Sequence, residues 1–146
     1  MDKKVLISRI DTSLPLPKYE TEESFGFDLL ARENTEVPPH TLGMIPGNVV
    51  VHCPPKTALL ILPRSSTFRK TGLIFPHSVG LIDADYNGPE DEIHIQVYNL
   101  LDQKITIQRG DRVAQGLFVS TIRADFEESD HAENEKKSRG GFGSTG

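Results

Sequence analysis

The sequence contains one cysteine, no tryptophan and no long apolar run. The single cysteine, Cys53, excludes an internal disulfide and is typical of proteins from a reducing compartment. No apolar stretch is long enough to cross a bilayer as a helix, and the residues after Met1 lack the apolar core and cleavage site of a signal peptide. We therefore expect a cytoplasmic protein, or a nuclear one in a eukaryote or virus, with no membrane partner.

An excess of positive charge is also absent. The chain has 16 lysines and arginines against 21 aspartates and glutamates, which gives a formal net charge of −5. Binding to a nucleic-acid backbone needs a positive surface, so this charge argues against nucleic acid as a partner. A small phosphorylated ligand needs only a few local cations and amide groups, and it remains compatible with the composition.

Long helical periodicity is missing as well, because ten prolines and twelve glycines interrupt the chain. Short strand-like runs take its place, some of them apolar throughout and others, Glu92–Asn99 and Lys104–Gln108, alternating between polar and apolar residues, and they predict β-strands. These runs are Val5–Ile10, Phe25–Leu30, Val49–His52, Thr57–Leu62, Leu73–Phe75, Glu92–Asn99, Lys104–Gln108 and Arg112–Ile122. The 146 residues fit a single all-β domain, a sandwich or barrel. The turn signal at Leu101–Gln103 predicts that the strands on either side of it pair as a hairpin.

One segment, Pro63–Gly72, breaks the strand pattern and predicts a short helix. Ser65 or Ser66 is the expected N-cap, and Gly72 is the expected stop. Free backbone amides, two hydroxyls and Arg64 at a helix start suit a phosphate group. A capped surface helix with a solvated Arg64 explains the same residues, and both interpretations stay open.

The segment Gly80–Gly88 is the strongest candidate for catalytic chemistry. Its terminal glycines allow sharp bends and a close approach to a ligand. On an extended chain Asp83 and Asp85 would share one face, opposite Tyr86. This pair of acids is compatible with a metal site, with a base and its helper, or with a polar hairpin end.

Other segments carry weaker signals. The five histidines have no zinc-ligand spacing, and Cys53 is expected to be a small packed residue rather than a nucleophile. The run Arg109–Gln115 is compatible with a tight turn closed by an Asp–Arg pair, which would place Gln115 near a ligand.

The composition changes after residue 124. Residues 1–124 form the predicted all-β domain, and residues 125–137 form a solvated acidic linker. Residues 138–146 contain four glycines with one arginine and one aromatic ring, which suits a flexible lid that orders over a ligand. A nucleic-acid-binding tail of the Arg-Gly-Gly type would need many repeats and a basic setting, and this chain has neither.

Five segments in order resemble the motifs of the trimeric dUTP pyrophosphatases. They are Phe25–Leu29, Pro63–Ser66, Gly80–Gly88, Arg109–Gln115 and Arg139–Gly146. The resemblance covers nearly the whole chain. It implies a jelly-roll-like subunit, a homotrimer with three shared active sites, and Mg²⁺-dependent hydrolysis of dUTP to dUMP and pyrophosphate. That activity keeps uracil out of DNA and supplies dUMP for thymidylate synthesis.

The resemblance also implies residue roles. Asp83 would be the general base for the water that attacks the α-phosphorus, and Tyr86 would lie under the deoxyribose and exclude a 2′-hydroxyl. The remaining substrate contacts would come from Arg64, Ser65 and Ser66 at the phosphates, from His77, Gly80, Leu81 and Ile82 at the nucleoside, and from the tail residues Arg139, Phe142, Gly143, Ser144 and Thr145. Phe142 would stack on uracil. Mg²⁺ would be held mainly by the phosphates, with Asp28 and Gln115 reaching it through water.

The chain departs from the family pattern at three places. His77 stands where the family often has asparagine, Asn87 follows the tyrosine in place of arginine or glutamine, and Pro89–Asp91 looks like an insertion. The insertion leaves the register of the next strand, near His94, open.

A dCTP deaminase shares the fold and the third motif, but the C-terminal Arg/Phe segment resembles the hydrolase lid. A non-catalytic nucleotide-binding protein of this fold would have lost Asp83, which is present.

Overall fold

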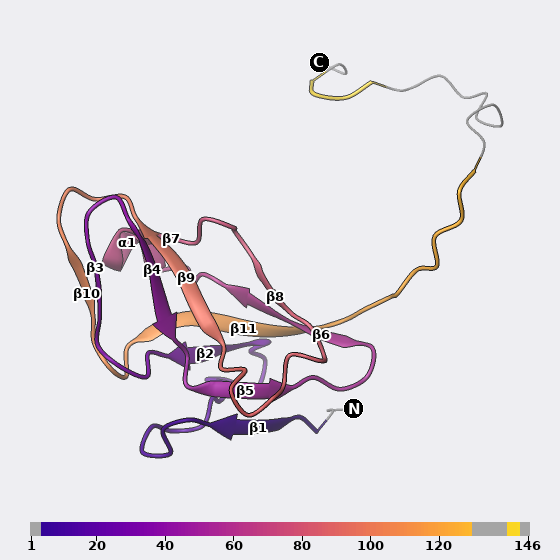
Figure 1. Cartoon of the computed structure of the whole chain (residues 1–146), viewed down its shortest axis with the longest axis horizontal. Coiled ribbons are helices and arrows are strands. Elements are labelled where there is room, and N and C mark those ends of the chain that lie inside the picture. Colours follow the sequence, from indigo (N-terminus) through magenta and orange to yellow (C-terminus); the bar gives the residue numbers. More distant parts are fainter. Residues whose placement is uncertain (1–3, 130–139, 144–146) are drawn as a thin grey trace.

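The computed structural model describes residues 4–129 and 140–143. This part of the chain contains eleven short strands and one helix of a single turn, which lies at one end of the molecule near β7 (Figure 1). The elements are β1 Leu6–Arg9, β2 Gly26–Leu30, β3 Thr35–Val37, β4 Leu42–Pro46, β5 Val49–His52, β6 Thr57–Leu62, α1 Thr67–Thr71, β7 Leu73–Ile74, β8 Gly80–Ile82, β9 His94–Asn99, β10 Ile105–Ile107 and β11 Arg112–Ser120. The all-β prediction with one short helix is confirmed.

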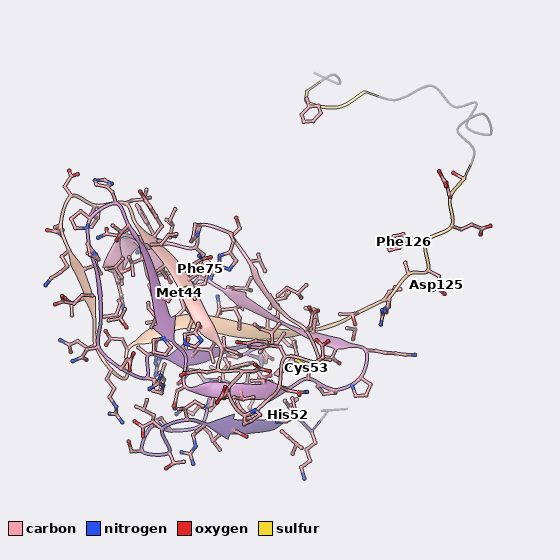
Figure 2. The ribbon with its side chains drawn as sticks, in the orientation of Figure 1. Met44, His52, Cys53, Phe75, Asp125 and Phe126 are labelled. Carbon is pink, nitrogen blue, oxygen red and sulfur yellow. The ribbon has the colours of Figure 1, made fainter. Side chains whose placement is uncertain are left out.

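The strands form four small antiparallel sheets. The largest has the order β2-β11-β6-β8, the second has the order β4-β9-β7, and two further pairs are β1-β5 and β10-β3. Apolar side chains from nearly all of them meet in one core, which includes the fully buried Leu29, Val51 and Leu59. Cys53 is buried beside this core, as expected for a small packed residue (Figure 2).

The nine-residue strand β11 lies at the centre of the main sheet, between β2 and β6. Its Gly116 is opposite Phe27 of β2, and a Cβ at this position would lie 2.4 Å from Phe27 Cζ. The Phe27 ring stacks on Phe118 with ring centroids 5.5 Å apart. Glycine is therefore required here, because it leaves room for the aromatic ring that packs the middle of the sheet.

The predicted hairpin of β9 and β10 is wrong. β9 pairs with β4 and β7, whereas β10 pairs with β3. The cause is the buried side chain of Asn99, whose Nδ2 donates to the carbonyl oxygens of Val37, Pro38 and Gln103 at 3.0, 3.2 and 2.8 Å. These bonds tie the connection after β9 to β3, so that β10 continues along β3.

The helix is present where the sequence predicts it, but the expected capping hydrogen bond from a serine is absent. Ser66 is at the N-cap position and Gly72 ends the helix with φ of 72°. Ser66 makes no capping hydrogen bond, however, and the Thr67 hydroxyl instead accepts the Arg64 N–H at 2.8 Å. No helix in the described residues is long and apolar enough to span a membrane.

The predicted turn before β11 is present, but an Asp–Arg pair does not close it. Gly110 has φ of 89°, and Asp111 Oδ2 accepts the N–H of Gln108 at 2.9 Å. Arg109 instead forms a salt bridge of 2.8 Å with Asp11, which lies in the loop after β1. The turn is closed by the Asp111 side-chain bond together with the backbone bond from the Asp111 N–H to the Gln108 carbonyl oxygen at 3.0 Å, and Arg109 instead holds the N-terminal loop.

Candidate active site

The main sheet brings three of the candidate segments together at one end. Gln115 of β11 is in register with Asp28 of β2 on one side and with Leu62 of β6 on the other. Arg64 follows β6 directly, and its Nε donates to Asp28 Oδ1 at 2.7 Å. The Gln115 side chain donates to the carbonyl oxygen of Pro63 at 3.0 Å. Asp28, Arg64 and Gln115 therefore form one cluster, which we call the phosphate-side cluster.

Charge within the phosphate-side cluster is balanced by a second arginine. Arg112 Nη1 lies 3.4 Å from Asp28 Oδ2, so the Asp28 carboxylate, whose side chain is 16% exposed, is held between two guanidinium groups. Arg64 is thus an ordered side chain and not the solvated arginine of a plain surface helix. Its Nη1 lies 3.5 Å from the Ser66 hydroxyl, and Ser65 beside it is exposed.

Asp83 lies just beyond the end of β8, in a turn and not on an extended strand. The Tyr86 N–H donates to the Asp83 carbonyl oxygen at 3.2 Å, which closes the turn. The expectation that Asp83 and Asp85 share one face of a strand is therefore wrong, because the extended backbone ends at Ile82. In the described residues the carboxylate of Asp83 makes no hydrogen bond or salt bridge, and it is exposed to solvent.

An open hollow of about 1060 Å³ lies in front of Asp83. Its lining includes Leu81 and Ala84 from the same segment, Lys56 and Ala58 from the start of β6, and Arg123 beyond β11. The charged residues that line the hollow are therefore the cations Lys56 and Arg123 and the carboxylates Asp83 and Asp85.

The phosphate-side cluster and Asp83 lie at opposite ends of β6. The antiparallel register pairs Leu59 with Ile82, so Asp83 is beside Ala58, whereas Arg64 follows the other end of the strand. Six residues of extended chain separate Ala58 from Arg64, or about 20 Å at ~3.3 Å per residue. The backbones of Asp83 and Arg64 in one chain are therefore about 20 Å apart, which is longer than the two P–O–P bridges of a triphosphate.

A second, smaller hollow of about 280 Å³ lies on the other side of β8. Gly80, Leu81 and Ile82 line it together with His77 and His94. The His77 ring stacks in parallel on Phe75, with centroids 6.3 Å apart, and its Nε2 is close to Gly80. The structure therefore places His77 with the three predicted nucleoside-contacting residues.

Pro89–Asp91, which the sequence suggests as an insertion, lies in a compact turn. Asp91 Oδ2 accepts the Gly88 N–H at 2.7 Å, and the Asp91 N–H donates to the Gly88 carbonyl at 3.0 Å. β9 then begins at His94, opposite Pro46 of β4. The Tyr86 hydroxyl reaches across the turn to the carbonyl oxygen of Glu92 at 3.1 Å. This turn thus leaves Tyr86 anchored, with 39% of its surface exposed.

Of the C-terminal candidates, the structure describes Phe142 and Gly143. Phe142 is fully exposed, and no atom of the described residues lies within 4 Å of the position that a Cβ would take at Gly143. Arg139, Ser144 and Thr145 lie outside the described residues, as does most of the predicted linker and lid. Residues 122–129 are exposed and lead away from the β-domain, and Asp125 and Phe126 mark this segment in Figure 2.

Sequence reasoning missed an ion pair near the Tyr86 turn. Arg32 Nε donates to both carboxylate oxygens of Glu92, at 2.6 and 3.0 Å. Strand alternation assigned Glu92 to the polar face with His94, whereas its side chain is only 6% exposed. A bulky charged pair 60 residues apart has no local sequence signal, and only strand register brings it together.

Comparisons with known proteins show the family of the chain. The sequence profile of the dUTPase family matches residues 12–146. The deoxyuridine 5'-triphosphate nucleotidohydrolase of Shewanella woodyi is 40% identical over 149 aligned positions, covering 100% of this chain and 96% of the relative. The corresponding protein of Legionella pneumophila is 38% identical, with coverage of 98% and 94%.

Solved structures give the same result at the level of the fold. The dUTPase from Streptococcus mutans has a TM-score of 0.75 and 35% identity, and the match covers 82% of this chain and 98% of that one. A mutant dUTPase from a Staphylococcus aureus phage, described with a coordinated structural Mg(II) ion, has a TM-score of 0.80 at 20% identity, with coverage of 90% and 99%. The profile match over nearly the full length and the 40% identity to a full-length relative establish that the chain belongs to the dUTPase family.

Proposed function

We propose that this dUTPase hydrolyses dUTP to dUMP and pyrophosphate with Asp83 as the general base. Asp83 takes a proton from a water molecule, and the water oxygen attacks the α-phosphorus. The bond from the α-phosphorus to its bridging oxygen breaks, and pyrophosphate leaves with the bonding electrons. The observation that carries this assignment is the carboxylate itself, which is exposed, lacks a hydrogen-bond partner in the described residues, and faces a hollow bordered by Lys56 and Arg123. A base must have its acceptor oxygens free for the water.

The phosphate-side cluster suits the triphosphate. Arg64 is oriented through its Nε, and its remaining N–H groups are the donors that a phosphate oxygen would use. Ser65 and Ser66 would add hydroxyl donors beside it. The tail residues Arg139, Phe142, Gly143, Ser144 and Thr145 would close over the bound substrate, with Phe142 stacking on the base.

The β8 segment suits the nucleoside. Gly80, Leu81 and Ile82 would present backbone groups to uracil, and His77 would take the place of the usual asparagine, since a neutral imidazole both donates and accepts a hydrogen bond. The Tyr86 ring, held at its hydroxyl by Glu92, would occupy the space that a 2′-hydroxyl needs.

The donor set at the phosphate-side cluster fits Mg²⁺ only as an ion that substrate phosphates hold. Asp28 is engaged by two arginines, and the described residues contain no group of three or more His, Cys, Asp or Glu side chains that could cage a metal. Mg²⁺ gives up its bound waters reluctantly, so Asp28 and Gln115 would reach it through water. Bound there, the ion would neutralise phosphate charge.

The separation of Asp83 from Arg64 supports a shared site. Because about 20 Å divides them along β6, a complete site would combine Asp83 of one subunit with the phosphate-side cluster of another. We infer a homotrimer with three such sites. In each subunit residues 1–124 would form the domain that holds the fixed site residues, residues 125–137 a linker, and residues 138–146 a lid over the substrate. The role would be to keep uracil out of DNA and supply dUMP in the cytoplasm, without a nucleic-acid or membrane partner.

The direct test measures pyrophosphate release from dUTP, dTTP, dCTP and UTP, with and without Mg²⁺. We expect dUTP to be strongly preferred and the rate to need Mg²⁺. Asp83→Asn should lower kcat by about 10²- to 10⁴-fold while the substrate still binds, which is the usual contribution of a positioned base. Glu23→Gln is the control, because Glu23 is an exposed carboxylate that does not line the hollow, whereas Asp85 does, and the rate should stay at the wild-type value. An unchanged rate in Asp83→Asn would remove Asp83 from the mechanism.

A further inference from the structure

One carbonyl oxygen near the proposed nucleoside site accepts hydrogen bonds from the side chains of two residues. The carbonyl oxygen of Glu92 accepts the Tyr86 hydroxyl at 3.1 Å and is 2.9 Å from Nδ1 of His94. A carbonyl oxygen can only accept, so Nδ1 of His94 must carry a hydrogen. In the neutral ring Nε2 is then the unprotonated nitrogen, and it is the one left for a ligand.

Glu92, which provides this oxygen, is held through its side chain and through the backbone of the next residue. The Glu92 side chain is 6% exposed and is bound through both oxygens by Arg32 Nε, and this bond raises the pKa of Arg32. On the backbone side, the next residue, Ile93, donates its N–H to Val49 and accepts the N–H of Gly47. The Ile93 N–H belongs to the same peptide group as the Glu92 carbonyl, so the backbone bonds hold the carbonyl, and the ion pair with Arg32 adds a second constraint through the Glu92 side chain.

The two side chains held by Glu92 lie where a nucleotide would be read. His94 lines the 280 Å³ hollow with Gly80, Leu81 and Ile82, and Tyr86 follows the free carboxylate of Asp83 by one turn. Neither Arg32 nor Glu92 lines that hollow. Their ion pair can act on a ligand only through the residues that it positions.

We propose that the Arg32–Glu92 ion pair is a positioning device for substrate selection, which sets Tyr86 and His94 through one carbonyl oxygen. The inference rests on the proposed function and adds the basis of its selectivity. A fixed Tyr86 ring rejects a ribose 2′-hydroxyl. An unprotonated Nε2 on His94 accepts the imide N3–H of uracil, whereas the N3 of cytosine has no hydrogen to donate.

The test compares kcat/KM for dUTP, UTP and dCTP in the full-length protein. Arg32→Met frees the Glu92 carboxylate and should lower the dUTP-to-UTP and dUTP-to-dCTP ratios by about two- to tenfold, the equivalent of one hydrogen bond. Arg32→Lys keeps the charge without the guanidinium geometry and should give a smaller loss in the same direction. Tyr86→Phe removes only the bond to Glu92 and should lower the dUTP-to-UTP ratio similarly.

A double variant separates positioning from simple destabilisation. If Arg32 acts through the Tyr86 hydroxyl, adding Arg32→Met to Tyr86→Phe should reduce the dUTP-to-UTP ratio little further, because both changes remove the same constraint. Independent effects would multiply, and that result would contradict the proposal. Lys104→Met is the matched control, since it breaks a salt bridge of 2.7 Å to Glu36 between β10 and β3 and should leave both ratios at the wild-type value.

Arg32→Met leaves a buried carboxylate unpaired, so its folding is checked by melting temperature. Where it does not fold, Arg32→Lys and Tyr86→Phe decide the question. Folded Arg32 variants with a lowered melting temperature and wild-type ratios would overturn the positioning role. A wild-type protein that releases no pyrophosphate from dUTP would instead overturn the proposed function, so the two failures are distinguishable.

Discussion

The division of the candidate site along β6 leads to a prediction about mixed assemblies. Asp83→Asn and Arg64→Gln each alter one half of the site and leave the other half intact. Asp28 keeps its contact with Arg112 when Arg64 is changed, so the Arg64→Gln subunit should still fold. Each variant alone should retain about one part in 10² or less of the wild-type rate.

Subunits of the two variants, co-expressed with different affinity tags or refolded together, should regain activity. Each site of a closed ring would take Asp83 from one subunit and Arg64 from another. In an equal, random mixture a given site receives an intact Asp83 half the time and an intact Arg64 half the time. About a quarter of the sites should therefore be complete, and the mixture should show about a quarter of the wild-type rate.

The assay is pyrophosphate release at saturating dUTP and fixed total subunit concentration. The control is the same mixture without subunit exchange, which should stay at the sum of the two residual rates. A fully exchanged mixture that remains at that low rate would show that one chain supplies both groups. That result would refute the reasoning from the strand register, which places them about 20 Å apart.

Three further predictions concern stability, reactivity and the tail. Gly116→Ala should lower the free energy of unfolding by about 1–3 kcal/mol, because its Cβ would overlap the buried Phe27 ring, whereas Gly141→Ala, with no atom within 4 Å, should leave the melting temperature unchanged. Cys53 should resist iodoacetamide at pH 8 until the protein is denatured. Burial raises the pKa of its thiol, so little thiolate is present in the folded state. Rapid alkylation of the native protein would contradict the burial of Cys53. A chain that ends at Lys137 should keep its melting temperature, because residues 122–129 are already exposed, and should hydrolyse dUTP far more slowly than the full chain; normal turnover would exclude the proposed lid.

Local sequence patterns predicted most strands, but the one pairing that they predicted, β9 with β10, is wrong. Val49–His52 and Thr57–Leu62 are strands with the expected bounds, because each is an uninterrupted apolar run. The strands Thr35–Val37 and Leu42–Pro46 were missed, since the first has three residues and the second contains both glycine and proline.

The pairing of β10 with β3 depends on Asn99. Its buried amide forms hydrogen bonds with two chain segments about 60 residues apart, at 3.0 Å to Val37 and 2.8 Å to Gln103. An asparagine at the end of an alternating run is typical of an ordinary turn. Its long-range partners appear only once the other strands are in place.

The sequence likewise predicts the residues of the candidate site but not how they are grouped in space. Asp83 and Arg64 stand just beyond strand ends and Gln115 lies within β11, and the motif pattern alone singles out all three for chemistry. Their division into two groups follows from the order β2-β11-β6-β8 and from the antiparallel register of β6 with β8, neither of which is written in any motif.

The Arg32–Glu92 pair is a second feature that the sequence pattern does not predict, and it bears on selectivity. Glu92 was expected to face solvent because it begins an alternating strand, yet the structure buries it and supplies Arg32 as its partner. A buried charge is costly unless it is paired, and an apolar pair of similar size would often be no less stable. Such a pair next to a recognition site is therefore better explained by what it holds in place than by the stability it provides. The selectivity ratios of the Arg32 variants measure that contribution separately from the melting temperature.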